Sequence, residues 1–149
     1  MPVVIGQIKH ALLFDIAIAI GLFFTLRPDA SEQLIHDWRE VVADDGARRA
    51  FDAMIAWARR DPKLECFPHP QGYIRSFRFL RGINLELAFA PNQQWLLFYF
   101  RAPYLRNSED QRDRVRLAFP DAKTTSSGEI SLRIKDEATA QQVIAYVTR

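Results

Sequence analysis

The stretch from Gly72 to Arg101 constrains the fold of this chain most, because runs of strand-forming residues are separated there by recognisable turns. Within it, Arg81-Gly82 and Pro91-Asn92 are typical of turns, since glycine tolerates positive φ and proline presets φ. Between these turns, large apolar residues occupy every second position, which predicts a half-buried strand. These residues are Ile83, Leu85, Leu87 and Phe89. The stretch therefore predicts a three-strand antiparallel meander, whose apolar face must be covered by helices.

Two helices are predicted shortly before the meander. Asp29 and Glu32 have the spacing of a capping box, and apolar residues then recur on one helical face. A second helix is expected from about Ala47 to Arg60, with arginines at the carboxyl end where they suit the helix dipole, and Pro62 ends it. The segment from Lys63 to Gln71 is interpreted as a short connector that its two prolines hold extended.

A helix, a strand and a last helix are predicted after the meander. Ser108 is placed to cap the first helix and Pro120 to end it. The segment from Asp121 to Gly128 is interpreted as a polar loop. Residues 129–135 alternate apolar and polar side chains, as in a half-buried strand whose charged outer side suits a sheet edge. Asp136-Glu137 then begins the final helix.

Together these elements predict an α+β fold with an antiparallel sheet of about four strands and helices packed on at least one face. The expected order is an N-terminal helical segment, a β-meander, and then α-β-α. The length of 149 residues and a hydrophobic content of 48% suit one domain, residues 1–149, with a helical part at 1–61 and a sheet-containing part at 72–149. Unrelated proteins share such an order, so we infer no family from it.

The N-terminal segment from Ala11 to Leu26 has two competing interpretations. As a strand it places large apolar residues on one face, and as a helix it places small residues on a ridge at Ala17, Gly21 and Thr25. We favour a buried helix because of the alanine and leucine content and the length. The segment is shorter than the ~20 apolar residues that span a membrane and contains Asp15, so we do not expect a membrane anchor. No cleavage site typical of a signal peptide follows it.

Net charge says little about a partner, but the distribution of charge says more. The chain has 20 Lys and Arg against 18 Asp and Glu, a net charge of +2. From Tyr73 to Arg116, however, eight arginines stand against four acids, a local charge of 8 − 4 = +4. The single cysteine, Cys66, excludes an intrachain disulfide and fits a reducing compartment, so we expect a cytoplasmic protein.

Signatures of catalysis, metal binding and cofactor binding are missing from the sequence. It contains no phosphate-binding loop, no nucleophile elbow and no metalloprotease helix motif, so we expect neither a cofactor nor an enzyme. The three histidines are scattered, which disfavours a metal site. One pair survives: a Cys66 thiolate activated by His69 would serve a cysteine-dependent enzyme. A catalytic Cys and His usually come together from distant segments with a third group to orient the base, whereas here prolines flank His69 within a connector, so we interpret Cys66 as structural.

The third predicted strand has two apolar faces. Leu96, Phe98 and Phe100 alternate with Trp95, Leu97, Tyr99 and Arg101. If the second face is not covered, its aromatic and guanidinium groups would form a binding platform. The candidate binding residues are Arg75, Arg78, Trp95, Tyr99, Arg101, Arg106, Arg112, Arg114 and Arg116.

The sequence therefore favours a non-catalytic interaction module that binds a protein partner or itself through these residues. Single-stranded DNA or RNA is the alternative ligand, because aromatic rings stack on bases and arginine binds phosphate. A cysteine-dependent enzyme is the third hypothesis.

Overall fold

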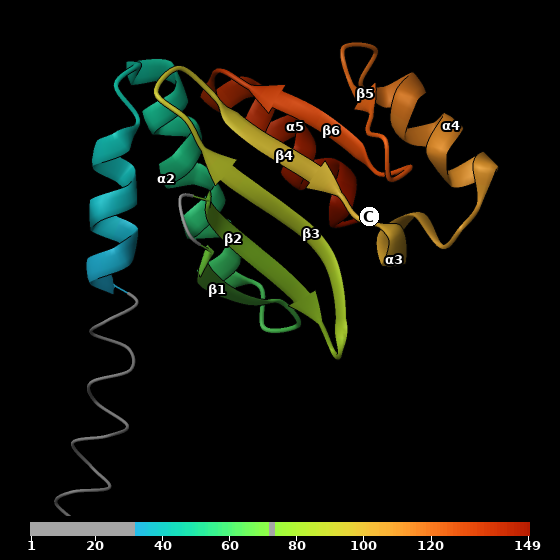
Figure 1. Ribbon diagram of the computed structural model, residues 1–149, viewed down its shortest axis with the longest axis horizontal. Helices are drawn as coiled ribbons and strands as arrows, with labels where there is room; N and C mark the ends of the chain where they lie inside the picture. Colours follow the sequence, from blue (N-terminus) through green and yellow to red (C-terminus); the bar gives the residue numbers. More distant parts are fainter. Residues whose placement is uncertain (1–31, 72–73) are drawn as a thin grey trace, which may run out of the picture. The chain divides into compact units, whose positions relative to one another are not determined.

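One antiparallel sheet of six strands organises the described part of the chain, which comprises residues 32–71 and 74–149 of a computed structural model (Figure 1). The strands are β1 (Glu65–Gln71), β2 (Ile74–Arg81), β3 (Asn84–Pro91), β4 (Leu96–Phe100), β5 (Lys123–Thr124) and β6 (Ile130–Ile134), in the spatial order β1-β2-β3-β4-β6-β5. The helices are a helix at residues 32–41, α2 (Asp45–Arg60), α3 (Ala102–Leu105), α4 (Glu109–Ala118) and α5 (Glu137–Val147). Residues from His36 to Arg149 form one compact unit.

This arrangement confirms the predicted α+β fold with an antiparallel sheet. The predicted capping of the later helices also holds, since Ser108 Oγ accepts from the Gln111 N–H and Asp136 caps α5. The interpretations of residues 11–26 and of Asp29 as a cap fall outside the described residues, so they stay predictions.

The described residues contain two strands that the sequence analysis did not predict. The polar loop after α4 includes the two-residue strand β5, and the supposed connector contains β1, which pairs with β2 along its whole length. Prolines suit β1 because of where their nitrogens point. Backbone groups of successive residues alternate between the two neighbouring strands. The 2.9 Å bond between Arg101 N and Glu86 O shows that the Glu86 backbone faces β4. Applying the alternation through the registers of β3, β2 and β1 places the nitrogens of Pro68 and Pro70 on the side of β1 that faces away from β2. An edge strand tolerates proline in that orientation.

An aromatic core fills the space between one face of the sheet and the helices α2 and α5, which lie behind the sheet in Figure 1. Phe51 of α2 meets Phe77 and Phe89 edge to face, with ring centroids 5.5 and 5.8 Å apart. Tyr146 of α5 meets Phe100 in the same way. Burying rings of this size supplies a large part of the hydrophobic stabilisation of a domain.

The predicted strand from Ile83 to Phe89 was wrong at its first residue. Ile83 is 95% exposed and belongs to the turn between β2 and β3, next to Gly82, which has a φ of 64°. In the sequence the apolar alternation includes Ile83, but the last residue pair of the β2–β3 hairpin is Arg81 with Asn84, so Ile83 lies beyond the paired strands.

Candidate interaction surface

The face of the sheet turned away from α2 and α5, here called the open face, carries Tyr99 near its centre. In the cross-strand register Tyr99 stands between Ala88 of β3 and Ser131 of β6. The same row continues outward to Arg78 of β2 on one side and Lys123 of β5 on the other. Within the described residues no helix lies over this face, which Figure 1 shows from the front. On this face Ala88 is buried, whereas Arg78, Leu97, Tyr99 and Ser131 are half-buried and keep part of their surface exposed.

The alternation predicted for the third strand of the meander is confirmed. Leu96, Phe98 and Phe100 are fully buried, whereas Leu97 and Tyr99 are half-buried and lie on the open face. Partial burial raises the pKa of Tyr99, although the nearby Arg101 lowers it. The phenol is consequently neutral at physiological pH, which suits an apolar contact with a hydrogen-bonding tip.

Trp95 lies at the end of the hairpin that leads into β4, and it is stacked by an arginine that the sequence analysis did not select. The Arg133 guanidinium carbon lies 4.4 Å from the centroid of the Trp95 ring. Arg133 reaches this position from β6, where it pairs across the sheet with Leu97. Arg133 was missed because the neighbourhood of β4 and β6 is set by the sheet order, which local patterns do not show.

Several of the predicted binding arginines form ion pairs within the protein. Arg101 Nε donates to Glu129 Oε1 at 2.7 Å, a contact that joins the end of β4 to the segment before β6. The glutamate side chain is only 16% exposed there. Arg101 is thus held in a partly buried pair, and a polyanion would have to compete with a fixed carboxylate for it.

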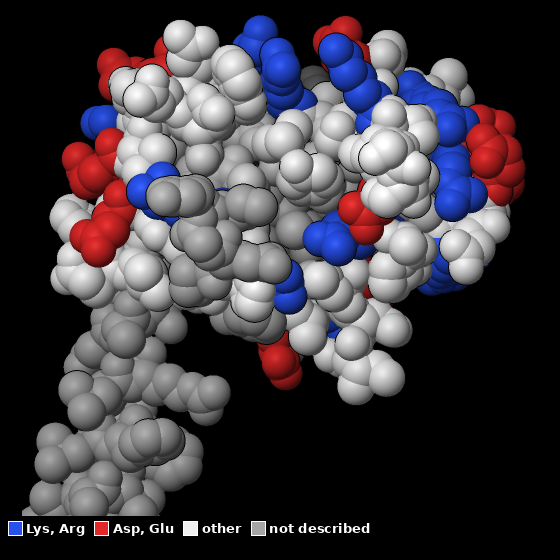
Figure 2. All heavy atoms as spheres, viewed as in Figure 1, with Lys and Arg blue, Asp and Glu red and all other residues white. Residues whose placement is uncertain are grey.

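The arginines of α4 pair with acids of their own helix. Arg114 lies 2.7 Å from Asp110, and Arg116 lies 2.8 Å from Glu109 and 2.9 Å from Asp113. Arg112 lies 3.6 Å from Glu109, and its Nε also donates to the Gly128 carbonyl. The local excess of positive charge in the sequence is therefore largely balanced on α4. Figure 2 shows these blue and red groups side by side at one end of the molecule.

The remaining predicted arginines do not form a cluster. Arg78 belongs to the central row of the open face, whereas Arg75 lies at the start of β2 and Arg106 lies in the left-handed conformation, with a φ of 51°, after α3. Among the described residues these three make no ion pair. The structure thus brings Arg78, Tyr99 and Trp95 to one side of the sheet and leaves Arg75 and Arg106 elsewhere along its strands and loops.

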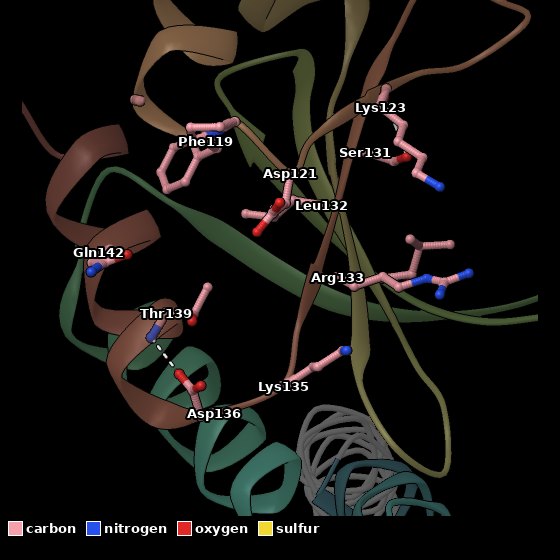
Figure 3. Close-up of a pocket in the computed structure, with 13 residues that line it drawn as sticks. Phe119, Asp121, Lys123, Ser131, Leu132, Arg133, Lys135, Asp136, Thr139 and Gln142 are labelled. Carbon is pink, nitrogen blue, oxygen red and sulfur yellow. Dashed lines mark hydrogen bonds between the residues drawn. The ribbon is translucent and has the colours of Figure 1, made fainter.

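A hollow of about 700 Å³ adjoins the outer side of β6, and the sequence analysis did not predict it. Figure 3 shows Lys123, Arg133 and Lys135 extending to one side of the strand, with Asp121, Thr139 and Gln142 on the other. Phe119, at the end of α4, contributes an apolar wall. The charged positions of β6 were visible in the sequence, but the hollow depends on how the chain leaves α4.

The candidate pair of Cys66 and His69 does not come together. In β1, Cys66 stands opposite Phe79 of the core face, whereas His69 stands opposite Ser76 of the open face. Burial raises the pKa of the Cys66 thiol to about 12, despite the opposing effect of Arg59. A thiol with such a pKa is a poor nucleophile at neutral pH, and these two side chains cannot act as a nucleophile and its base.

Residues 32–71 and 74–149 contain no group of His, Cys, Asp and Glu side chains arranged to hold a metal ion. No helix among these residues has the length and apolar character needed to cross a membrane. The fold and the surface therefore describe an α+β protein whose sheet has one face with both aromatic and cationic side chains. Comparison with protein-family models, curated proteins and solved structures found no match to the chain.

Proposed function

We propose that this protein is a non-catalytic interaction module that binds a protein partner through the open face of its sheet. The observation that carries the proposal is the row with Tyr99 at its centre, flanked by Leu97 and by the stacked pair of Trp95 and Arg133. Tyrosine, tryptophan and arginine are the residues that most often dominate protein interfaces. The single cysteine fits a reducing compartment, so we propose that binding takes place in the cytoplasm.

The charge arrangement supports a protein partner over a nucleic acid. Affinity for nucleic acid depends chiefly on cations that neutralise phosphates. Arg101 and the α4 arginines already contact carboxylates, so phosphate would gain little from them. Single-stranded nucleic acid remains a second candidate because of one specific observation, namely that Arg78 and Lys123 occupy the same cross-sheet row as Tyr99.

Photo-crosslinking from within the face tests the proposal. A photoreactive amino acid placed at Tyr99 should capture a defined protein in the native cells, and Leu97→Asp should abolish that capture. The same amino acid at Ala56, which is exposed on α2, gives the background. Capture of the same proteins at both positions would contradict the proposal.

Binding to labelled oligothymidylate and oligouridylate separates the two candidates. We expect no measurable binding at low salt. Salt-sensitive binding with a logarithmic slope of about −0.7 for each phosphate neutralised, weakened by Tyr99→Ala, would replace the proposal with the nucleic-acid function.

A further inference from the structure

Strand β6 has an outer edge that β5 covers only in part. The register with β4 extends over all of β6, whereas β5 stands opposite only Ile130 and Ser131. The 2.8 Å bond from Thr125 N to Glu129 O turns the Glu129 backbone toward β5. Because backbone direction alternates along an antiparallel strand, Arg133 points to the same side as Glu129. Within the described residues the ladder ends at Ser131, so the N–H and C=O of Arg133 face outward with no strand beside them.

The chain leaves room beside this edge. After α4, Ala122 N donates to the Phe119 carbonyl at 3.0 Å, and this turn leads the chain away from the line that β5 would follow past Lys123. The hollow of about 700 Å³ occupies the vacated position, between the Phe119 side and the first turns of α5. It therefore offers space next to an unpaired strand edge.

The two sides of the edge differ in charge (Figure 3). Lys123, Arg133 and Lys135 extend to the open-face side, and none of them forms an ion pair with another described residue. The opposite side carries Asp121 together with Asp136, whose carboxylate accepts the Thr139 N–H at 2.8 Å as the cap of α5. An added strand would thus meet cations with every second side chain and an acidic or neutral wall with the others.

We propose that the β6 edge binds an extended segment of a protein partner as an added strand, with acidic side chains at alternate positions. This inference rests on the proposed function and names the chemistry of the partner. The backbone of the segment pairs with Arg133, as in β-augmentation. Its acidic side chains meet Lys123, Arg133 and Lys135, and its neutral side chains face the opposite side, which carries Phe119 and Asp121.

Other occupants fit this edge less well. A second copy paired antiparallel about Arg133 would place two guanidinium groups opposite each other, which destabilises a strand pair. Residues 1–31 contain acidic residues only at Asp15 and Asp29, too far apart to supply the alternation. Nucleic acid cannot continue a peptide ladder. The other edge of the sheet is closed to strand addition where Pro68 and Pro70 lack the N–H.

The test uses the full chain and two labelled synthetic peptides of equal composition. One peptide alternates Glu and Thr, and the other has the same residues in two blocks. Fluorescence anisotropy should show tighter binding of the alternating peptide. Equal binding of both would overturn the inference, since it would reveal attraction to charge without strand pairing.

Two substitutions at one position separate the side chain from the backbone. Arg133→Ala removes the guanidinium, and Arg133→Pro also removes the outward N–H while sparing the bonds of β6 to β4. We expect the proline variant to bind the alternating peptide about threefold to tenfold more weakly than the alanine variant, the effect of one hydrogen bond. Equal affinities of the two variants, both folded by circular dichroism, would overturn the inference.

Charge variants and NMR keep the inference testable if the proline variant does not fold. Lys135→Glu should weaken peptide binding, whereas Lys63→Glu, an exposed lysine before β1, should not. Amide shifts in the wild-type protein should change at Ser131 to Lys135. Shifts centred on Ala88 and Tyr99 instead would overturn the edge site but leave the proposed function standing, and binding of oligothymidylate without binding of either peptide would overturn both.

Discussion

Replacing Gly46 by alanine should destabilise this protein, although the same change stabilises most helices. Gly46 is the second residue of α2, where a Cβ atom would lie 2.8 Å from the Lys135 carbonyl oxygen and 3.1 Å from Asp44 Oδ1. The first contact is closer than real Cβ atoms come to backbone, and backbone at the junction of β6 with α5 cannot turn aside as a side chain can. The second contact disturbs the carboxylate that caps α2 by accepting the Ala47 N–H at 2.9 Å.

The magnitude follows from opposing effects. Alanine gains at most about 1 kcal/mol over glycine in helix propensity. Overpacking against fixed backbone costs about 1–3 kcal/mol, and a weakened N-cap costs about 1 kcal/mol. We therefore expect the free energy of unfolding to fall by about 1–3 kcal/mol in total.

Urea unfolding followed by tryptophan fluorescence measures this loss as a lower midpoint at an unchanged slope. The control is Ala56→Gly, at an exposed position of the same helix, which should cost about 0.5–1 kcal/mol through propensity alone. If Gly46→Ala instead stabilises the protein by about the amount that Ala56→Gly costs, then α2 does not approach the β6–α5 junction as closely as described.

Four further predictions follow from the contacts of single residues. The Arg101–Glu129 pair, 2.7 Å apart and partly buried, should show a coupling free energy of about 0.5–1 kcal/mol in a double-mutant cycle, and no coupling would make the contact incidental. Cys66, with its pKa raised by burial to about 12, should react with iodoacetamide at neutral pH far more slowly in the folded than in the urea-unfolded protein, and an apparent pKa below 8 would contradict its structural role. Burial raises the pKa of Tyr104 to about 12, so the folded state holds the phenolic proton more tightly than the unfolded state and stability should fall as pH rises from about 10 to 12; Tyr104→Phe should make that fall smaller, and an unchanged profile would refute it. Pro68→Thr supplies an outward N–H on β1 and should promote concentration-dependent association in sedimentation velocity, whereas a variant that stays as monomeric as the wild type would show that the prolines do not protect this edge.

The strands with strong apolar periodicity could be predicted from the sequence. β1 and β5 could not, because they are recognisable only from their pairing with neighbouring strands. The alternation in β4 and β6 marks the buried face residue by residue, as Phe98 and Leu132 illustrate. In β3 a register shift between Leu85 and Leu87 interrupts the alternation, and Leu87, Ala88 and Phe89 are all buried. β1 has prolines that argue against a central strand, and its place at an edge is not a local property. β5 is too short to carry a pattern.

The candidate surface divides in the same way. The outward position of Tyr99 followed from alternation alone. The i,i+4 spacing of Asp110 and Arg114 was also a usable signal for a paired helix face, so the positive charge of α4 was overestimated from the sequence. In contrast, the pairing of Arg101 with Glu129 and the stacking of Arg133 on Trp95 depend on β4 lying beside β6, which local spacing does not determine.

The two edges of the sheet differ in how they meet other chains, and this difference bears on function. A free strand edge invites pairing with any extended chain, so an edge is usually blocked or charged. β1 is blocked by Pro68 and Pro70, which leaves its outward side poor in donors. β6 instead keeps the outward N–H of Arg133, with cations on the open-face side of the edge and a hollow beside it. Cations repel a second copy of the same edge but attract an acidic segment, so one set of charges both discourages self-pairing and selects a partner.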